Sequence, residues 1–233
     1  MQKSFGFFGA LAALMLSGSS SGQIDPSQPT LIGAEEHGFQ FGVRSGYAIP
    51  FGTAYGIPGQ TDTANFKDVI KGMIPIWGDV GYRFNPNWYV GGFFQFGIGL
   101  VPSNSDCSTA GVSCSENDLR FGLNFHYHML PEEGFDPWIG LGAGYEIVNQ
   151  SLSVGSISGS GSLKGFEFGN LQLGLDLKLS PAFAVGPFVA FTIAQFSDVS
   201  ASALGVTFSP NIDKKIHEWL LFGVRGIFNL NLD

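Results

Sequence analysis

Apolar and polar residues alternate with a period of two along most of the chain from residue 38 onward. In segment 119–129 the odd positions carry Leu, Phe, Tyr and Met, while the even positions carry Arg, Gly, Asn and His. Segment 170–179 repeats the pattern, with leucine at every odd position from 171 to 179. Because successive side chains of a strand point to opposite faces, these segments predict β-strands that lie between two different environments.

The same pattern predicts eight strands, joined by connections that alternate between short and long. The predicted strands are residues 38–50, 72–84, 88–101, 117–129, 137–150, 165–179, 183–196 and 216–232. Short connections are expected at 85–87, 130–136 and 180–182, and long loops at 51–71, 102–116, 151–164 and 197–215. Short turns on one rim, long loops on the other and an even strand number are typical of outer-membrane barrels, whose short turns lie in the periplasm. We therefore predict an all-β fold, a closed antiparallel eight-stranded transmembrane up-and-down β-barrel, with both termini periplasmic.

Side-chain volume decides which face of the predicted barrel points inward. A soluble eight-stranded barrel of the lipocalin kind also alternates, but it turns its apolar face toward an internal ligand. Eight strands enclose room only for filling side chains or one small ligand, whereas most of the predicted strands carry four or more large apolar residues on one face. The opposite face is rich in glycine, which is 34 of the 233 residues. We expect the polar and glycine-rich face inside and the apolar face against lipid.

The start of the chain predicts a secretory signal peptide. Lys3 supplies a positive charge, residues 5–16 are an apolar stretch too short to span a bilayer, and residues 17–22 are small. A buried N-terminal helix is the alternative. We expect cleavage near Gly22, which gives a signal peptide at 1–22, an N-terminal periplasmic segment at 23–37 and an outer-membrane β-barrel at 38–233.

Charged residues are only 13% of the chain, and several of them fall on the predicted inner face. The formal net charge of −8 and the lack of a basic cluster argue against nucleic acid as a partner. The inner-face charges are Arg44, Asp79, Arg83, Arg120, Glu146, Asp176, Lys178 and Arg225. If the turn at 130–136 sets the register of its strands, Arg120 faces Glu146 and His126 faces Gly140.

Buried charges must be paired, because each unpaired ion costs several kcal/mol. These residues therefore predict a lumen charge network. It is either a plug of salt bridges that holds the barrel together or a charged constriction that selects a solute. We favour the plug, because a barrel of this size is filled by its own side chains.

Cys107 and Cys114 are the two cysteines, and both fall in the predicted loop 102–116 with six residues between them. In a chain exported to an oxidising compartment this pair predicts a disulfide. Free thiols are the alternative. Zinc binding is disfavoured, because no further His or Cys lies nearby to complete a site.

The chain resembles the family of small eight-stranded outer-membrane barrels that includes OmpW, OmpX and the membrane domain of OmpA. The resemblance covers about residues 38–233 and is clearest over 119–146, with its Pro131-Glu132-Glu133-Gly134 turn and the run Gly140-Leu141-Gly142-Ala143-Gly144-Tyr145. Family members commonly end in a strand that closes on an aromatic residue, whereas this chain ends Asn231-Leu232-Asp233. The resemblance implies an outer-membrane location, with outer-membrane lipid, lipopolysaccharide and the outer-membrane assembly machinery as partners.

Three classes of function are compatible with these patterns. The first is a structural or narrow passive-transport barrel for small solutes, including hydrophobic ones, with Phe93, Phe188, Ala190 and Ile227 as candidate lumen residues. The second is a surface-interaction or adhesion protein that acts through its extracellular loops. We favour the first, because the loops are rich in Ser, Gly and Thr and poor in the aromatic and arginine anchors of strong binding patches.

The third class is a lipid-modifying enzyme, suggested by His126, His128 and Asp118 on one strand face. A catalytic base must lie within hydrogen-bond reach of its nucleophile, and no serine shares that face near the histidines. We expect no enzymatic activity, no catalytic residues, no metal and no cofactor.

Overall fold

The computed structural model describes residues 37–61, 63–101, 107, 111–155 and 157–231. The predicted signal peptide at 1–22 lies outside these residues, and so does the predicted periplasmic segment up to residue 36. The chain's last two residues also lie outside them.

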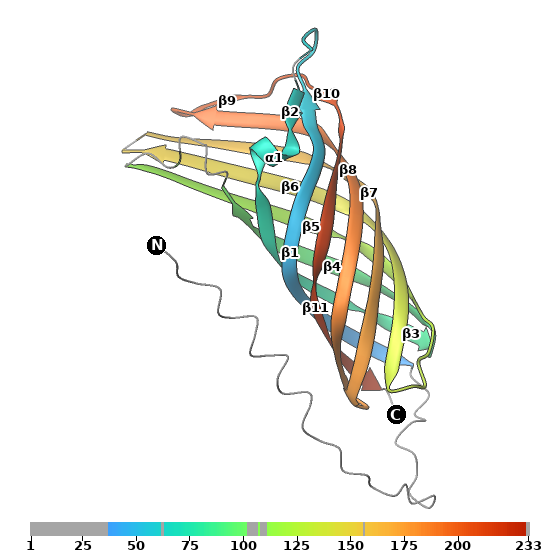
Figure 1. The fold of residues 1–233 in the computed structure, drawn as a ribbon. Helices are drawn as coiled ribbons and strands as arrows, with labels where there is room; N and C mark the ends of the chain where they lie inside the picture. Colours follow the sequence, from blue (N-terminus) through green and yellow to red (C-terminus); the bar gives the residue numbers. More distant parts are fainter. Residues whose placement is uncertain (1–36, 62, 102–106, 108–110, 156, 232–233) are drawn as a thin grey trace, which may run out of the picture. The chain divides into compact units, whose positions relative to one another are not determined.

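Eight long strands of the described residues form a closed antiparallel ring (Figure 1). They are β1 (Gly38–Gly56), β3 (Gly72–Asn85), β4 (Trp88–Leu100), β5 (Val112–His128), β6 (Phe135–Val154), β7 (Ile157–Ser180), β8 (Phe183–Ala203) and β11 (Ile216–Asn231). Each long strand pairs with the next, and β1 pairs with both β11 and β3, so the ring closes. The predicted eight-stranded barrel is confirmed.

Four short elements lie between the long strands. They are β2 (Thr63–Asn65), α1 (Phe66–Val69), β9 (Val206–Phe208) and β10 (Asp213–Lys214). β2 and β10 pair with β1, and β9 pairs with β8. All four belong to the predicted long connections, and we call that end of the barrel the long-loop end and the opposite end the short-turn end. No helix in the described residues is both long and apolar enough to cross a membrane.

The two faces of the barrel wall are sorted as the alternation predicted. On β7, Leu171 and Leu173 are exposed on the outside, while the intervening Gln172 is fully buried inside. The same holds on β5, where Leu123 is 69% exposed and the neighbouring Asn124 is buried. An outer wall of exposed leucine, phenylalanine and valine is stable only against hydrocarbon, because apolar surface is unfavourable in water.

Glycine makes room inside the wall where a large side chain lies across it. Gly81 and Gly91 face each other on β3 and β4, and a Cβ at either position would collide with the ring of Tyr89 and with the opposite backbone. Tyr89 itself is 1% exposed. Glycine at these two positions therefore allows a tyrosine to fill the lumen.

The structure corrects the predicted long loops, because much of their sequence belongs to the sheet. β6 and β7 stay paired up to Val154 and Ile157, so the predicted loop at 151–164 is a tight hairpin. β5 begins at Val112, β8 continues to Ala203 and β1 continues to Gly56. Serine and glycine have low strand propensity, but pairing with neighbouring strands overrides that preference.

Candidate functional site

Polar side chains fill the barrel interior in three clusters, which we name from their position along the strands. The short-turn cluster consists of Arg83, His128, Asp136, Asp176 and Arg225. The middle cluster consists of Arg44, Trp77, Asp79, Asn124 and Gln172. The long-loop cluster consists of Arg120, Glu146, Glu167, His217 and Trp219. All of these side chains are buried.

The short-turn cluster is organised by two aspartates. Asp136 lies 2.7 Å from Nδ1 of His128 and 4.0 Å from the guanidinium of Arg83. Arg225 donates a hydrogen bond of 3.2 Å to Asp176 and stacks its guanidinium 4.1 Å above the ring of Trp138. Each aspartate therefore has a cationic or donor partner close by, which offsets the cost of burying a charge.

The middle cluster is a closed circuit around Asp79. This carboxylate accepts hydrogen bonds from Arg44 (2.7 Å), Trp77 (3.1 Å) and Asn124 (2.9 Å). Arg44 also donates to Gln172 (2.6 Å), and Gln172 donates to Asn124 (2.9 Å). A buried carboxylate with three donors holds its partners in one arrangement. The cluster therefore fills the centre of the barrel as one rigid unit.

The long-loop cluster contains two acidic residues with separate partners. Glu167 forms an ion pair with Arg120 and accepts a hydrogen bond from Asn170. Glu146 accepts a hydrogen bond of 2.7 Å from Nε1 of Trp219 and lies 2.7 Å from Nε2 of His217. These contacts join β5 to β7 and β6 to β11 across the lumen.

The connection between β1 and β3 folds inward and covers the long-loop cluster. Phe66 at the start of α1 is fully buried, with its ring centroid 4.5 Å from that of His217 and 4.9 Å from that of Trp219. The side chain of Gln150 on β6 donates a 2.8 Å hydrogen bond to the carbonyl of Val69 and fixes the end of α1. The predicted long loop at 51–71 is thus partly a lid over the lumen.

The structure places seven of the eight predicted network residues inside the barrel, with at most 7% exposure. They are Arg44, Asp79, Arg83, Arg120, Glu146, Asp176 and Arg225. The eighth, Lys178, is half-buried and donates to the carbonyl of Pro131 at the short-turn end. The structure brings Arg44 to Asp79 and Arg225 to Asp176.

β5 and β6 pair in the predicted register, with Arg120 opposite Glu146 and His126 opposite Gly140. The hydrogen bonds described for these two charged residues, however, lead to other strands: Arg120 bonds to Glu167, and Glu146 bonds to His217 and Trp219. Cross-strand neighbours therefore need not be the strongest partners when the lumen offers side chains from the opposite wall.

Sequence reasoning missed Glu167 because β7 contains a bulge. Gly142 pairs with Asn170 and Gly144 with Glu167, so one β6 residue lies opposite two β7 residues, Phe168 and Gly169. A bulge shifts the alternation by one residue. Phe166 and Phe168 are both 58% exposed, and Glu167 points into the lumen. The sequence indicates the inward orientation of Glu167 only through its neighbours, because two outward-facing phenylalanines, Phe166 and Phe168, flank this single glutamate.

The histidines and aspartate considered for catalysis are not brought together. His126 packs between the rings of Tyr89 and Trp138, at centroid distances of 4.8 and 4.9 Å. Asp118 lies eight positions away on the same strand, about 26 Å along it at 3.3 Å per residue, and accepts a hydrogen bond from Gln95. Among the described residues, no group of three or more His, Cys, Asp or Glu is arranged to hold a metal ion.

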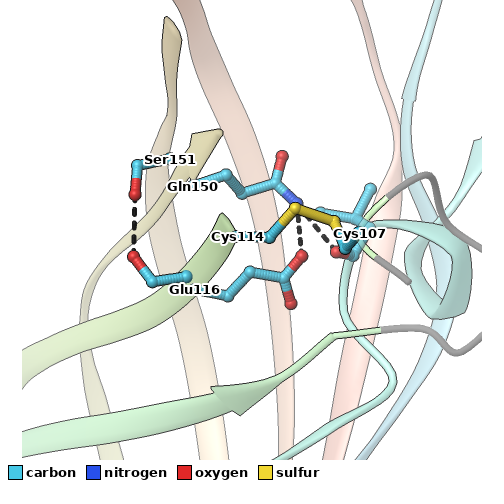
Figure 2. Close-up of a disulfide and its surroundings, with 7 residues drawn as sticks. Cys107, Cys114, Glu116, Gln150 and Ser151 are labelled. Atoms are coloured by element: carbon cyan, nitrogen blue, oxygen red, sulfur yellow. Dashed lines mark hydrogen bonds between the residues drawn. A yellow bond between two sulfur atoms is a disulfide. The ribbon is translucent and has the colours of Figure 1, made fainter. Parts of the chain in front are cut away.

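Cys107 and Cys114 form a disulfide at the long-loop end, with their Cα atoms 5.7 Å apart (Figure 2). Cys114 lies in β5 instead of in the predicted loop, so the bond ties residue 107 to the sheet. Beside it, Gln150 donates a 2.9 Å hydrogen bond to Glu116. Partial burial raises the pKa of the Glu116 carboxyl to about 7, and the hydrogen bond from Gln150 opposes this increase.

Comparison with solved structures places this fold among bacterial outer-membrane barrels. The chain is similar to the outer-membrane protein AlkL in lipid bilayers, at 16% identity and a TM-score of 0.51, over 90% of this chain and 99% of that one. It is also similar to OprG from Pseudomonas aeruginosa (17% identity, TM-score 0.48, 84% and 99% covered) and to Neisserial surface protein A (13%, 0.46, 82% and 97%). No protein-family model and no curated protein sequence matches the chain. The fold is that of a small eight-stranded outer-membrane β-barrel.

Proposed function

We propose that this chain is a structural barrel of the bacterial outer membrane, closed to ions, that displays an extended β-sheet outside the cell. The main observation in support of this proposal is that side chains fill the lumen. The three clusters and α1 occupy the interior from the short-turn end to the long-loop end. Eight strands leave no further space for an aqueous channel.

The outer face of the wall supports the second half of the proposal. On β5 and β6 the outward positions carry apolar residues as far as Leu119 and Ile147, and the next outward positions are Asn117 and Asn149. The hydrocarbon belt therefore ends at this level. β6 continues for five more residues after Asn149, which is about 17 Å at 3.3 Å per residue. Long connections of such barrels face the exterior, so this sheet extension would lie outside the cell.

A narrow path for small apolar solutes is a second candidate, and one observation favours it. Gly78 and Gly92 leave a hollow of about 410 Å³ in the lipid-facing wall between β3 and β4. Phe93 belongs to its lining and also packs against Trp77 inside the lumen, at a centroid distance of 5.0 Å. Phe188, Ala190 and Ile227 are buried with it and fill the interior.

Two measurements test the proposal. In planar bilayers, the purified protein should give little steady ion conductance, and a large stable conductance would overturn the closed lumen. For orientation, Ser158→Cys at the long-loop end and Ala182→Cys at the short-turn end can be compared on intact cells with a membrane-impermeant maleimide. Only the Ser158→Cys variant should react before the outer membrane is permeabilised. The reverse labelling would show that the sheet extension faces the periplasm.

A further inference from the structure

The part of the sheet beyond the hydrocarbon belt carries hydroxyl and amide side chains in ordered rows on its outer face. One row crosses five strands at Ser115, Ser151, Ser160, Ser202 and Thr207. The row nearer the membrane consists of Asn117, Asn149, Ser162 and Ser200. We call these two rows the hydroxyl face. On β5 and β6 the outer wall changes from apolar at Leu119 and Ile147 to polar and uncharged at Asn117 and Asn149. On β7 and β8 the charged residues Lys164 and Asp198 lie opposite each other between the belt and the hydroxyl face.

The hydroxyl face is hollowed. A depression of about 210 Å³ lies across β5, β6, β7 and β8, and eight of the nine hydroxyl-face residues line it, all except Thr207. This is the space of about seven waters at roughly 30 Å³ each, enough for one sugar ring and more than an isolated ion requires. The strands that form it are those that extend past the ring closure of β1 and β3 (Figure 1).

The hydrogen bonds within the hydroxyl face leave much of its capacity unused. Ser115 and Ser151 share one hydrogen bond of 2.7 Å, Ser202 and Thr207 share one of 2.8 Å, and Asn149 donates to Asn117 at 3.0 Å. Each hydroxyl has one donor and two acceptor sites, and each asparagine amide has two donors and two acceptor sites, so all three pairs keep unused hydrogen-bonding groups. The hydroxyl oxygen of Ser162 is buried and has no hydrogen-bond partner. A buried polar atom without a partner is costly, which favours a ligand that supplies one.

We propose that this hollow binds a neutral oligosaccharide. Sugar hydroxyls both donate and accept hydrogen bonds, and so do the serine hydroxyls and asparagine amides that line the hollow. An anionic ligand would need cationic groups and a metal ion would need carboxylates, whereas all nine residues of the hydroxyl face are Ser, Thr or Asn. The nearest charges on this side, Lys164 and Asp198, lie opposite each other across β7 and β8.

The position of the hollow fits this ligand chemistry. On β5 and β6 it begins directly above the apolar belt, at the level where saccharide groups of membrane glycolipids lie, and it is open to glycans from outside. The inference rests on the proposed display of the sheet at the cell surface. The test of sugar binding uses purified protein in nanodiscs and does not depend on which way the protein faces in the cell. The labelling of intact cells and the sugar-binding test can therefore fail independently.

The test is an amide NMR titration of the isotope-labelled protein in lipid nanodiscs with two probes. One is lipopolysaccharide O-chain freed of lipid A, and the other is a panel of neutral mammalian oligosaccharides. Saturable shifts should be confined to β5–β8 above the belt, and the responding probe identifies the bacterial or the host source. The double variant Ser162→Ala and Ser200→Ala should weaken binding about tenfold or more, because two hydrogen bonds are lost.

A matched control is available one row further from the membrane. Ser153 and Ser158 lie opposite each other on the same face but do not line the hollow. Their double alanine variant should bind within about twofold of the unmodified protein, since each hydroxyl there already faces solvent. Equal weakening in both double variants would place binding outside the hollow and overturn the proposal. Unchanged spectra with every probe would overturn it as well.

Discussion

Arg120 on β5 and Glu167 on β7 form a buried ion pair across β6, the strand that separates them. Both side chains are at most 2% exposed. The pair joins strands that are not neighbours and neutralises two buried charges. Its formation depends on the bulge at Phe168 and Gly169, which turns Glu167 inward.

Glu167→Ala should lower the free energy of unfolding by about 3 to 5 kcal/mol, because it leaves the Arg120 guanidinium buried without its counter-ion. Urea unfolding in liposomes measures the change. Glu132→Ala in the exposed turn between β5 and β6 is the control and should stay within about 0.5 kcal/mol of the unmodified protein. Similar losses in both variants would show that the ion pair does not stabilise the barrel.

Depth along β7 should decide the effect of a new charge on the outer face. Leu173→Arg should destabilise the barrel by about 2 to 4 kcal/mol as a charge at mid-bilayer, whereas Ser160→Arg should cost at most about 1 kcal/mol. Both positions point outward on one strand, so the comparison isolates position relative to the belt. Refolding into liposomes provides the measurement, and equal losses would mean that the belt extends over the hydroxyl face.

The disulfide should secure the segment before β5 without determining barrel stability. In protein isolated under oxidising conditions, neither Cys107 nor Cys114 should be alkylated unless a reductant is added. The double variant Cys107→Ser and Cys114→Ser should lose less than the roughly 2 to 4 kcal/mol typical of a disulfide, because Cys114 lies in the sheet extension beyond the belt. A loss of that size or larger in urea unfolding would contradict this prediction.

Glu116 should titrate near pH 7. Its pKa of about 7 in the folded state exceeds the ordinary value of 4.5, so the folded protein binds more protons than the unfolded chain between these values. The corresponding contribution to stability is present below about pH 4.5 and is lost as the pH rises through about 7. Carboxyl carbon NMR should show this transition, and Glu116→Gln should remove it. A midpoint near 4.5 would mean that the carboxyl is well hydrated.

The strands and their orientation could be predicted from the sequence, because a two-faced environment imposes strict alternation on each of them. The register of β5 and β6 followed from one short turn. The inward orientation of Glu167 was not predicted, because a bulge interrupts the alternation at this point of β7. The inward fold of α1 was not predicted either. Phe66 lies in a stretch without periodicity, and only its contacts with His217 and Trp219 determine its position.

The sheet extension was missed for a different reason. Ser151, Ser153, Ser158 and Ser160 have the composition of a loop, and they form strands because two paired neighbours offer backbone partners. Their low strand propensity is a local property, whereas the pairing is a property of the closed barrel. The hydroxyl face therefore could not be predicted from the sequence, because it depends on the strand register that aligns its serines.

Ring closure between β1 and β3 extends only to Ala48 and Met73, while β6 and β7 remain paired to Val154 and Ile157. The rim at the long-loop end is therefore much taller on one side than on the other. A neighbouring protein or glycolipid that diffuses in the membrane plane meets a low rim beside β3 and a raised one beside β6. The barrel thus has a front and a back within the membrane, and its rotation about the membrane normal determines which of them a neighbour encounters.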